Sequence, residues 1–412
     1  MSFIRIPVKG MRDIMPDEMI LREYVINELC CIYSLYGFKR IETPCVEHIE
    51  NISNNQGGEN EKLIFKILKR GEKLDLENSK KIEDLVDSGL RYDLTVPLTR
   101  YYANNMNNLD NPFKAIQIGN VWRADRPQKG RFRQFVQCDI DIFGEKTSLA
   151  EIELITATTS VLDKFGLANY KIIINDRRIL KAMALYAGFN ENECDSVFIS
   201  LDKIDKIGIP GVKEELILNG FDEHIIDKYL DLFTENNNDI VNFCYQIDEK
   251  FLSKDIVDNL KDIIDTLINL KNINIEFDPS LVRGMSYYTG PIFEIKVQGS
   301  NGSIGGGGRY DEMVSKYANV SVPACGFSIG FERLINILIE SNYKIPEHRE
   351  KYAFVIENDE FKTNKEKYLN EINKLREKNI IVNVQLKSKN FKHQKEVLEN
   401  QGYIIYLNGE KI

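Results

Sequence analysis

Positive charge is concentrated in one short stretch of this 412-residue chain, "RADRPQKGRFRQF" at positions 123–135. The stretch contains a single carboxylate, that of Asp125, and ends in the aromatic Phe135; its cations are Arg123, Arg126, Lys129, Arg131 and Arg133. Crowded cations repel one another unless an anion binds among them, and guanidinium groups match phosphate oxygens in pairs. The stretch therefore indicates a polyphosphate site, with Phe135 available to stack on a base. A solvated turn is the alternative interpretation.

Two further arginines stand in glycine-rich settings. Arg283 lies in "LVRGMSYYTG" beside Tyr287 and Tyr288, and Arg333 lies in "GFSIGFERL", in the first turns of an expected helix. A helix start favours anions, and an arginine there adds to that preference. The "GGGG" run at 305–308 is either a flexible loop or a place where the backbone approaches a ligand closely.

Several other kinds of site are disfavoured. The chain contains no G-x-x-x-x-G-K-[ST], and its glycine run does not fit G-x-G-x-x-G before a helix. The four histidines are far apart in sequence, which disfavours a Ser-His-Asp triad or a histidine-based metal site. The seven cysteines are scattered and form no C-x-x-C, so neither a zinc cage nor a disulfide framework is expected.

Composition and charge bound the class of protein. The length predicts two or three domains, and a net charge of −9 argues against wholesale coating of nucleic acid while allowing a local basic site. The N-terminal "MSFIRIPVKGMRDIMPDE" lacks the apolar core of a signal peptide, and no 18-residue apolar run follows. These features predict a soluble cytoplasmic protein with reduced thiols.

The expected secondary structure places the basic stretch at the tip of a hairpin. "FKAIQIGNVWRA" (113–124) and "FRQFVQCDIDIFG" (132–144) are strand-like, so the stretch between them predicts an antiparallel pair with a charged connection. Helical spacing of apolar residues predicts helices over 17–36 and 149–166. "LRYDLTVPLTRYY" (90–102) is expected to run briefly extended and then enter a helix.

Composition changes twice along the rest of the chain. Residues 171–276 are rich in Asp, Lys and Asn at helical spacing and predict an inserted, mainly helical domain. Strand-like segments with glycines return between 277 and 339. From 345 onward, strand and helix alternate, which predicts a small α/β unit with parallel strands.

Taken together, these stretches resemble a class II aminoacyl-tRNA synthetase, and within that class the histidyl-tRNA synthetase family. "YGFKRIETP" resembles the dimer-forming motif 1, "GNVWRADRPQKGRFRQFVQCDIDIFG" motif 2 and "GFSIGFERL" motif 3. "LVRGMSYYTGPIFE" and "GGGRYD" are similar to the two histidine-specific signatures. The resemblance implies an α+β fold, with an antiparallel sheet flanked by helices. The catalytic core would span 1–340, interrupted by the insertion at 171–276, and a short anticodon-binding-like domain would span 345–412.

The resemblance also implies a role for individual residues. In the ATP site, Arg123 would contact the α-phosphate, Asp125 the adenine amine and Arg131 the distal phosphates, with Phe135 and Arg333 on the two faces of adenine. In the histidine site, Asp93, Thr95 and Gln137 would hold the α-amino group, and Asp141, Tyr288 and Tyr310 would surround the imidazole, with Tyr287 adjacent. Arg283 would lie between the histidine carboxylate and the α-phosphate, so Arg283 and Arg123 are the expected catalytic residues.

The implied reaction joins L-histidine to ATP as histidyl-adenylate and then passes histidine to tRNA(His). The substrate carboxylate is already a nucleophile at neutral pH, so the chemistry needs positioning and charge neutralisation, which arginines and Mg²⁺ provide. The resemblance implies Mg²⁺ without identifying its ligands, and motif 1 implies a homodimer.

The sequence departs from the family pattern at two places. "RGMSYY" has Met285 and Ser286 where the family has Leu-Asp, and the C-terminal unit stops at "YIIYLNGEKI", earlier than the family's anticodon-binding domain. The second departure keeps two alternatives open. One is a paralogue that activates histidine for an acceptor other than tRNA, and the other is a non-catalytic, histidine-sensing regulatory subunit of ATP phosphoribosyltransferase.

Overall fold

The computed structural model describes residues 3–53, 60–127, 131–167, 169–233, 239–271, 273–283, 287–298, 302–346 and 349–412. The chain divides into two units, Met1–Tyr343 and Lys344–Ile412. None of the helices in these ranges is long and apolar enough to cross a membrane.

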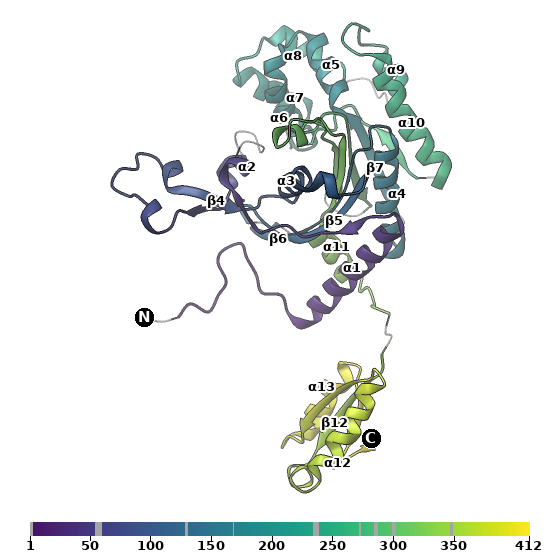
Figure 1. The fold of residues 1–412 in the computed structure, drawn as a ribbon. Coiled ribbons are helices and arrows are strands. Elements are labelled where there is room, and N and C mark those ends of the chain that lie inside the picture. The colour runs from purple at the N-terminus through teal and green to yellow at the C-terminus, as the bar shows by residue number, and fades with distance from the viewer. Residues whose placement is uncertain are drawn as a thin grey trace. The chain divides into compact units, whose positions relative to one another are not determined.

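The first unit is built on an eight-stranded sheet (Figure 1). Its strands, in spatial order, are β1 (Lys39–Arg40), β5 (Phe113–Trp122), β6 (Gln134–Phe143), β11 (Ala324–Ile329), β10 (Ser303–Arg309), β9 (Pro291–Val297), β7 (Tyr170–Asp176) and β8 (Ile275–Phe277). Neighbours are antiparallel except at the two edges, where β1 pairs with β5 and β7 with β8 in parallel. The predicted hairpin of β5 and β6 is confirmed, as is the α+β fold class.

Helices cover the sheet. Helix α1 (Pro16–Leu35) buries residues spaced four apart, among them Val25, Leu29 and Tyr33, which places them on one face. In Figure 1, α1 and α11 (Phe331–Glu340) lie below β5 and β6, whereas α3 (Thr95–Asn105) lies above them. Helix α4 (Leu149–Lys164) packs against both α1 and β11. The helices predicted over 17–36 and 149–166 are therefore confirmed.

A smaller three-stranded sheet adjoins α3. It consists of β2 (Val46–His48), β4 (Val86–Leu90) and β3 (Lys66–Leu68), all antiparallel. The short helix α2 (Ile49–Ser53) packs on it. Tyr92 and Asp93 lie two and three residues beyond the end of β4, between this sheet and the start of α3.

The mainly helical segment follows strand β7 of the large sheet and leads into strand β8, which pairs with β7. Its helices are α5 (Arg177–Ala187), α6 (Cys194–Leu201), α7 (Ile204–Leu218), α8 (Glu223–Asp231), α9 (Ile240–Cys244) and α10 (Lys254–Lys271). The expected boundaries of 171 and 276 were too wide, because Tyr170–Asp176 and Ile275–Phe277 are neighbouring strands of the sheet. The run Ile172–Ile174 is buried in the sheet, and Asp176 then caps α5 by accepting from the Arg178 amide.

The second unit is a small α/β fold. Strands β12 (Lys351–Ile356), β13 (Ile381–Leu386) and β14 (Ile404–Leu407) are parallel, and β15 (Glu410–Lys411) adds an antiparallel edge. Alternate residues of β12 face two cores, one beneath α12 (Asn358–Glu377) and one beneath α13 (Phe391–Asn400). The parallel pairing predicted from the alternation of strand and helix is confirmed.

Candidate functional site

One cavity in the first unit brings together the residues that the sequence singled out. It has a volume of about 620 Å³ and lies against β6, β10 and β11, between the starts of α3 and α11. Its lining includes Asp93, Thr95, Arg123, Asp125, Arg131, Phe135, Gln137, Asp141, Arg283, Tyr287, Tyr288, Tyr310 and Arg333. Lys129, Met285 and Ser286 lie outside the described residues.

The floor of the cavity follows from the two-residue period of a strand. Phe135, Gln137, Asp139 and Asp141 alternate along β6, so all four project from one face, and all four line the cavity. The sequence of β6 therefore places an aromatic ring, an amide and two carboxylates in one row.

Glycines on the neighbouring strands make room above this floor. Gly326 lies opposite Asp141 in the register of β11 and β6, and a Cβ on it would lie 1.9 Å from Asp141 Oδ1. A Cβ on Gly306 of β10 would lie 2.5 Å from Arg283 Nη1. The "GGGG" run is thus a strand, not a loop, and Gly306 permits Arg283 to cross it closely.

One end of the cavity is a buried carboxylate surrounded by tyrosines. The Tyr310 hydroxyl donates to Asp141 Oδ1 at 2.5 Å, while Asp141 Oδ2 is buried without a hydrogen-bond partner among the described residues. Burial raises the pKa of Asp141 to about 7. The ring of Tyr287 lies 5.0 Å from that of Tyr288 and 5.9 Å from that of Tyr310, measured between centroids. This end suits a small flat ring that donates an N–H group.

Next to it lies a group of acceptors. Asp93 is buried, and its Oδ1 accepts from the Val96 amide at 3.0 Å, which fixes the carboxylate at the start of α3. Thr95 is the first residue of that helix. Gln137 turns its Nε2 toward Asp139 and Ser328, and its Oε1 is buried without a partner in the described part of the chain. An ammonium group would find acceptors here.

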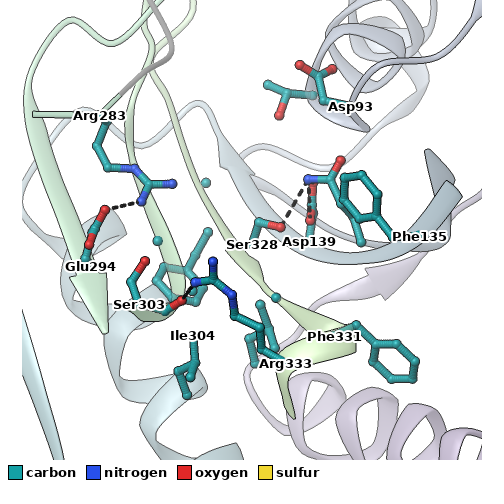
Figure 2. A pocket seen from close by; sticks show the side chains of 18 of the residues that line it. Asp93, Phe135, Asp139, Arg283, Glu294, Ser303, Ile304, Ser328, Phe331 and Arg333 are labelled. Atoms are coloured by element: carbon teal, nitrogen blue, oxygen red, sulfur yellow. Dashed lines mark hydrogen bonds and ion pairs between the residues drawn. The ribbon is translucent and has the colours of Figure 1, made fainter. Parts of the chain in front are cut away.

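The other end carries the arginines (Figure 2). Arg283 pairs with Glu294 at 2.6 Å, and its Nε is buried with no partner in the residues that the structure describes. Arg333 donates to the Ser303 carbonyl. In Figure 2, Glu294, Arg283 and Arg333 lie on one side of the cavity, across from Phe135.

The hairpin supplies two more cations. The Arg123 guanidinium lies over the rings of Tyr92 and Phe135, at 4.3 and 5.2 Å from their centroids, and its Nε donates to the Tyr92 carbonyl at 3.1 Å. The exposed Arg131 pairs with Asp125 at 3.0 Å. Arginines at one end, among them Arg283 with its unpartnered Nε, and buried acceptors at the other suit a ligand pair consisting of a polyphosphate and a small amino acid.

Comparison with known proteins decides the family. A sequence profile described as histidyl-tRNA synthetase matches residues 10–334, which is more than three-quarters of the chain. The chain belongs to the histidyl-tRNA synthetase family.

Individual relatives agree with this family assignment. The histidine--tRNA ligase of Leifsonia xyli subsp. xyli is 44% identical over 351 residues, which cover 81% of this chain and 80% of that protein. The histidine--tRNA ligase of Azobacteroides pseudotrichonymphae is 38% identical, with 83% and 77% covered.

Solved structures are similar along almost the whole chain. The crystal structure of histidyl-tRNA synthetase from Nostoc sp. PCC 7120 has a TM-score of 0.76 at 26% identity, covering 98% of this chain and 92% of that one. A Bacillus halodurans protein, described as an ATP phosphoribosyltransferase regulatory subunit/histidyl-tRNA synthetase, has a TM-score of 0.78 at 21% identity, covering 99% of both chains. At 21% identity, the likeness to the Bacillus halodurans structure shows only a shared fold.

The sequence analysis does not identify several residues that line this cavity. Asp139, Ser328 and Glu294 face it from β6, β11 and β9, and Asp202 reaches it from the end of α6. Alternation along "QCDID" could have revealed Asp139, since it lies between Gln137 and Asp141 on one face. Nothing local distinguishes Asp202, because its place depends on how the helical segment packs.

Glu332, beside Arg333, was also missed. It forms two bonds with Arg22 of α1, at 2.7 and 2.8 Å, and accepts from the Val136 amide at 3.3 Å. The start of α11 is thereby tied to both α1 and β6.

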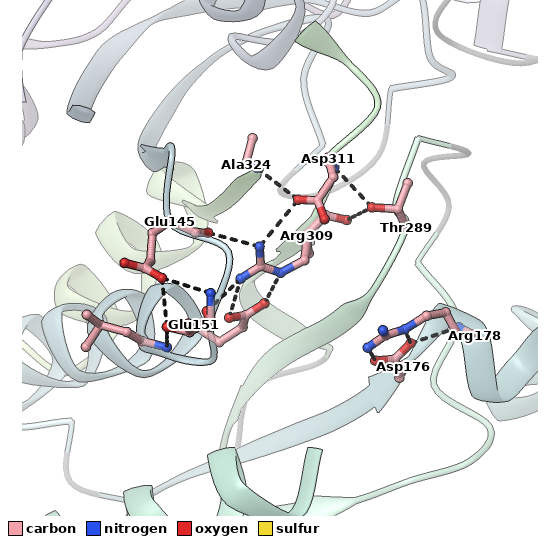
Figure 3. A network of polar contacts seen from close by, with 10 residues as sticks. Glu145, Glu151, Asp176, Arg178, Thr289, Arg309, Asp311 and Ala324 are labelled. Carbon is pink, nitrogen blue, oxygen red and sulfur yellow. Dashed lines mark hydrogen bonds and ion pairs between the residues drawn. The ribbon is translucent and has the colours of Figure 1, made fainter. Parts of the chain in front are cut away.

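Arg309 anchors the wall that carries Tyr310 (Figure 3). Its guanidinium forms two bonds with Glu151 of α4, at 2.7 and 2.8 Å, and donates to the carbonyls of Thr147 and Glu145 at 2.9 and 3.1 Å. The next carboxylate, Asp311, accepts from the Ala324 amide at 2.9 Å. Tyr310 therefore stands between two fixed neighbours, and this fixes its hydroxyl against Asp141.

Proposed function

We propose that this chain activates L-histidine with ATP to form histidyl-adenylate and transfers the histidine to tRNA(His), using the cavity described above. The observation that carries the proposal is one continuous cavity with the buried Asp141–Tyr310 pair at one end and Arg123, Arg283 and Arg333 at the other. The relatives named histidine--tRNA ligase support it.

The histidine side chain enters the tyrosine-walled end. Asp141 Oδ2 accepts an imidazole N–H, because Oδ1 is already occupied by Tyr310. Tyr287 and Tyr288 supply the walls around the ring. An amino acid without a ring N–H leaves this buried carboxylate unpaired, and that cost provides selection against it.

The α-ammonium group of histidine is held by Asp93, Thr95 and Gln137. This placement is supported by the buried Asp93 carboxylate at the start of α3 and by the unpartnered Gln137 Oε1. With both the ring and the ammonium group held, the substrate carboxylate points toward Arg283.

ATP occupies the arginine end. Arg123 contacts the α-phosphate, Asp125 the adenine amine and Arg131 the outer phosphates, while Phe135 and Arg333 enclose the adenine. The aromatic face of Phe135 and the unpartnered Nε of Arg283 at the cavity wall support this orientation.

The activation step is an in-line displacement. A histidine carboxylate oxygen forms a bond to the α-phosphorus as the bond from that phosphorus to the bridging oxygen breaks, and pyrophosphate leaves with the electron pair. No general base is required, because the carboxylate is already ionised. Arg283 and Arg123 neutralise the charge that grows on the α-phosphoryl oxygens.

Mg²⁺ accompanies ATP in this proposal. Among the described residues no group of three metal-ligating side chains is present, so the chain offers no preformed cage there. Mg²⁺ bound to a triphosphate needs only one or two carboxylates besides phosphate oxygens. Asp202 and Glu294 line the cavity together with Arg283 and are suitable ligands, and Mg²⁺ would supply further charge neutralisation.

Transfer to tRNA involves the other parts of the chain. We assign Lys344–Ile412 to an anticodon-binding domain and the helices between β7 and β8 to an insertion domain of the catalytic core.

A homodimer in the cytoplasm completes the proposal. The N-terminal segment exposes Phe3, Ile4, Ile6 and Val8 by 66 to 98%, which favours burial against another surface. All seven cysteines are free, as in a reducing compartment. Light scattering of the purified chain tests the dimer.

Two assays test the reaction. Histidine-dependent exchange of pyrophosphate into ATP reports activation, and charging of tRNA(His) with labelled histidine reports transfer. Exchange without charging would favour a different acceptor, and histidine binding without exchange would favour a regulatory subunit. The relatives named histidine--tRNA ligase favour neither alternative.

A further inference from the structure

A closed set of polar contacts joins Gln137, Asp139 and Ser328 on the sheet face that lines the cavity. Gln137 Nε2 donates to Asp139 Oδ2 and Oδ1 at 3.3 and 3.5 Å, and to Ser328 Oγ at 3.2 Å (Figure 2). Asp139 lies directly opposite Ser328 in the register of β6 and β11. Asp139 is only 3% exposed and lines the cavity, yet the roles assigned above do not use it.

The other amide side chain beside Asp139 in the sheet, that of Gln117, already has partners. Gln117 lies opposite Asp139 on β5, but its Nε2 donates to the Leu94 carbonyl at 3.0 Å, and its Oε1 accepts from Thr43 at 2.9 Å. Gln137 therefore supplies the amide donor that Asp139 receives from this row of the sheet.

This arrangement determines which way the Gln137 amide faces. A side-chain amide has a donor end and an acceptor end, and either can point toward the ligand. The reverse orientation would place Gln137 Oε1 against the oxygens of the Asp139 carboxylate, and the Ser328 hydroxyl beside them already donates its hydrogen to Asp139. The observed orientation instead leaves Oε1 buried and without a partner among the residues described.

Such an unpartnered, buried carbonyl oxygen is costly unless a ligand donates to it. The α-ammonium group of an amino acid carries three donors and no acceptor, and would be repelled by an amide presented with its N–H₂ outward. Burial and the nearby Asp141 raise the pKa of Asp139, while a hydrogen bond from Ser328 lowers it. The arrival of a cationic group beside Gln137 favours the ionised, accepting form of Asp139.

We propose that Asp139 is a positioning residue that, with Ser328, holds the Gln137 amide with its oxygen facing the α-ammonium group of the substrate. This inference rests on the proposed function and deepens it. Asp139 acts through Gln137 and has no direct contact with the substrate.

The test compares two ligands and three variants. The ligands are histidine and 3-(imidazol-4-yl)propanoate, which lacks the α-amino group. The variants are Asp139→Asn, Ser328→Ala and Gln137→Ala, each also combined pairwise, and dissociation constants are measured by calorimetry on the full chain.

Asp139→Asn can satisfy the Gln137 amide in either orientation, so histidine should bind at least fivefold more weakly, while binding of the des-amino analogue should change less than twofold. Ser328→Ala should show the same selectivity with a smaller loss, and it introduces no change of buried charge. In the Gln137→Ala background, Asp139→Asn should add little further loss, because the residue through which it acts is gone.

Three results would overturn the inference. Equal weakening of both ligands would indicate general damage to the pocket. An undiminished effect of Asp139→Asn in the Gln137→Ala background would indicate that Asp139 acts independently. Wild-type affinity of Asp139→Asn for histidine would remove the role altogether. In contrast, a wild-type chain that neither binds histidine nor exchanges pyrophosphate would refute the proposed function itself.

Discussion

The Tyr310 hydroxyl donates to one oxygen of Asp141 at 2.5 Å, and the other oxygen of that carboxylate remains without a partner in the described part of the protein. Asp141 Oδ1 is thus bound within the fold, and Oδ2 is the oxygen that could accept from a ligand. Because Arg309 and Asp311 fix the backbone on both sides of Tyr310, the carboxylate is held in place without a ligand, as the proposed histidine site requires.

Tyr310→Phe is expected to change the pH dependence of histidine use. Burial raises the pKa of Asp141 to about 7, and the Tyr310 hydrogen bond works against that rise. Without the hydroxyl the pKa of Asp141 increases, so the rise of kcat/KM for histidine with pH should move to higher pH. Free histidine titrates identically in both assays, so a difference between the pH profiles of variant and wild type reflects the titration of a group on the enzyme. An unchanged profile would contradict this account of Asp141.

Two glycines on the same sheet face should give opposite kinetic signatures when replaced by alanine. In Gly326→Ala the new methyl displaces Asp141, so KM for histidine should rise about tenfold or more with little change in KM for ATP. In Gly306→Ala the methyl displaces Arg283, so kcat should fall more than either KM changes. Steady-state exchange kinetics measure both, and each variant controls for the other. The same pattern in both would indicate only general damage to the sheet.

Glu151→Gln is expected to destabilise the first unit by about 3–5 kcal/mol, because it removes the carboxylate that forms two bonds with the buried Arg309 and leaves only Asp311, at 3.4 Å, to balance that charge. The two side chains are only 8% and 1% exposed. Unfolding in urea measures the loss.

A matched control is Lys261→Met, which breaks an exposed pair with Asp265 one helical turn away. It should alter the unfolding free energy by no more than about 0.5 kcal/mol. Equal stability of Glu151→Gln and wild type would mean that Arg309 does not depend on Glu151.

Much of the site could be predicted from the sequence because its residues lie in short, continuous stretches. The β5–β6 hairpin brings Arg123 and Phe135 together through local pairing alone. Strand alternation then sets Gln137 and Asp141 on the same face. For these residues, local order in the sequence determines their order in space.

The remaining features depend on contacts between distant parts of the chain. Arg22 and Glu332 are separated by 310 positions, and Arg309 and Glu151 by 158, so no local sequence pattern predicts either ion pair. Most of the strand Tyr170–Asp176 falls within residues 171–276, whose Asp, Lys and Asn at helical spacing predict a helical insertion. Its buried Ile172–Ile174 centre is the feature that identifies it as part of the sheet.

Arg283 provides the most direct test of the central claim that this cavity activates histidine. In Arg283→Ala, exchange of pyrophosphate into ATP should fall by roughly a hundredfold or more, since a group that neutralises charge in the transition state is lost. Histidine binding, measured by calorimetry on the same protein, should remain detectable because Asp93, Gln137 and Asp141 are intact. Exchange near the wild-type rate in Arg283→Ala would contradict the account.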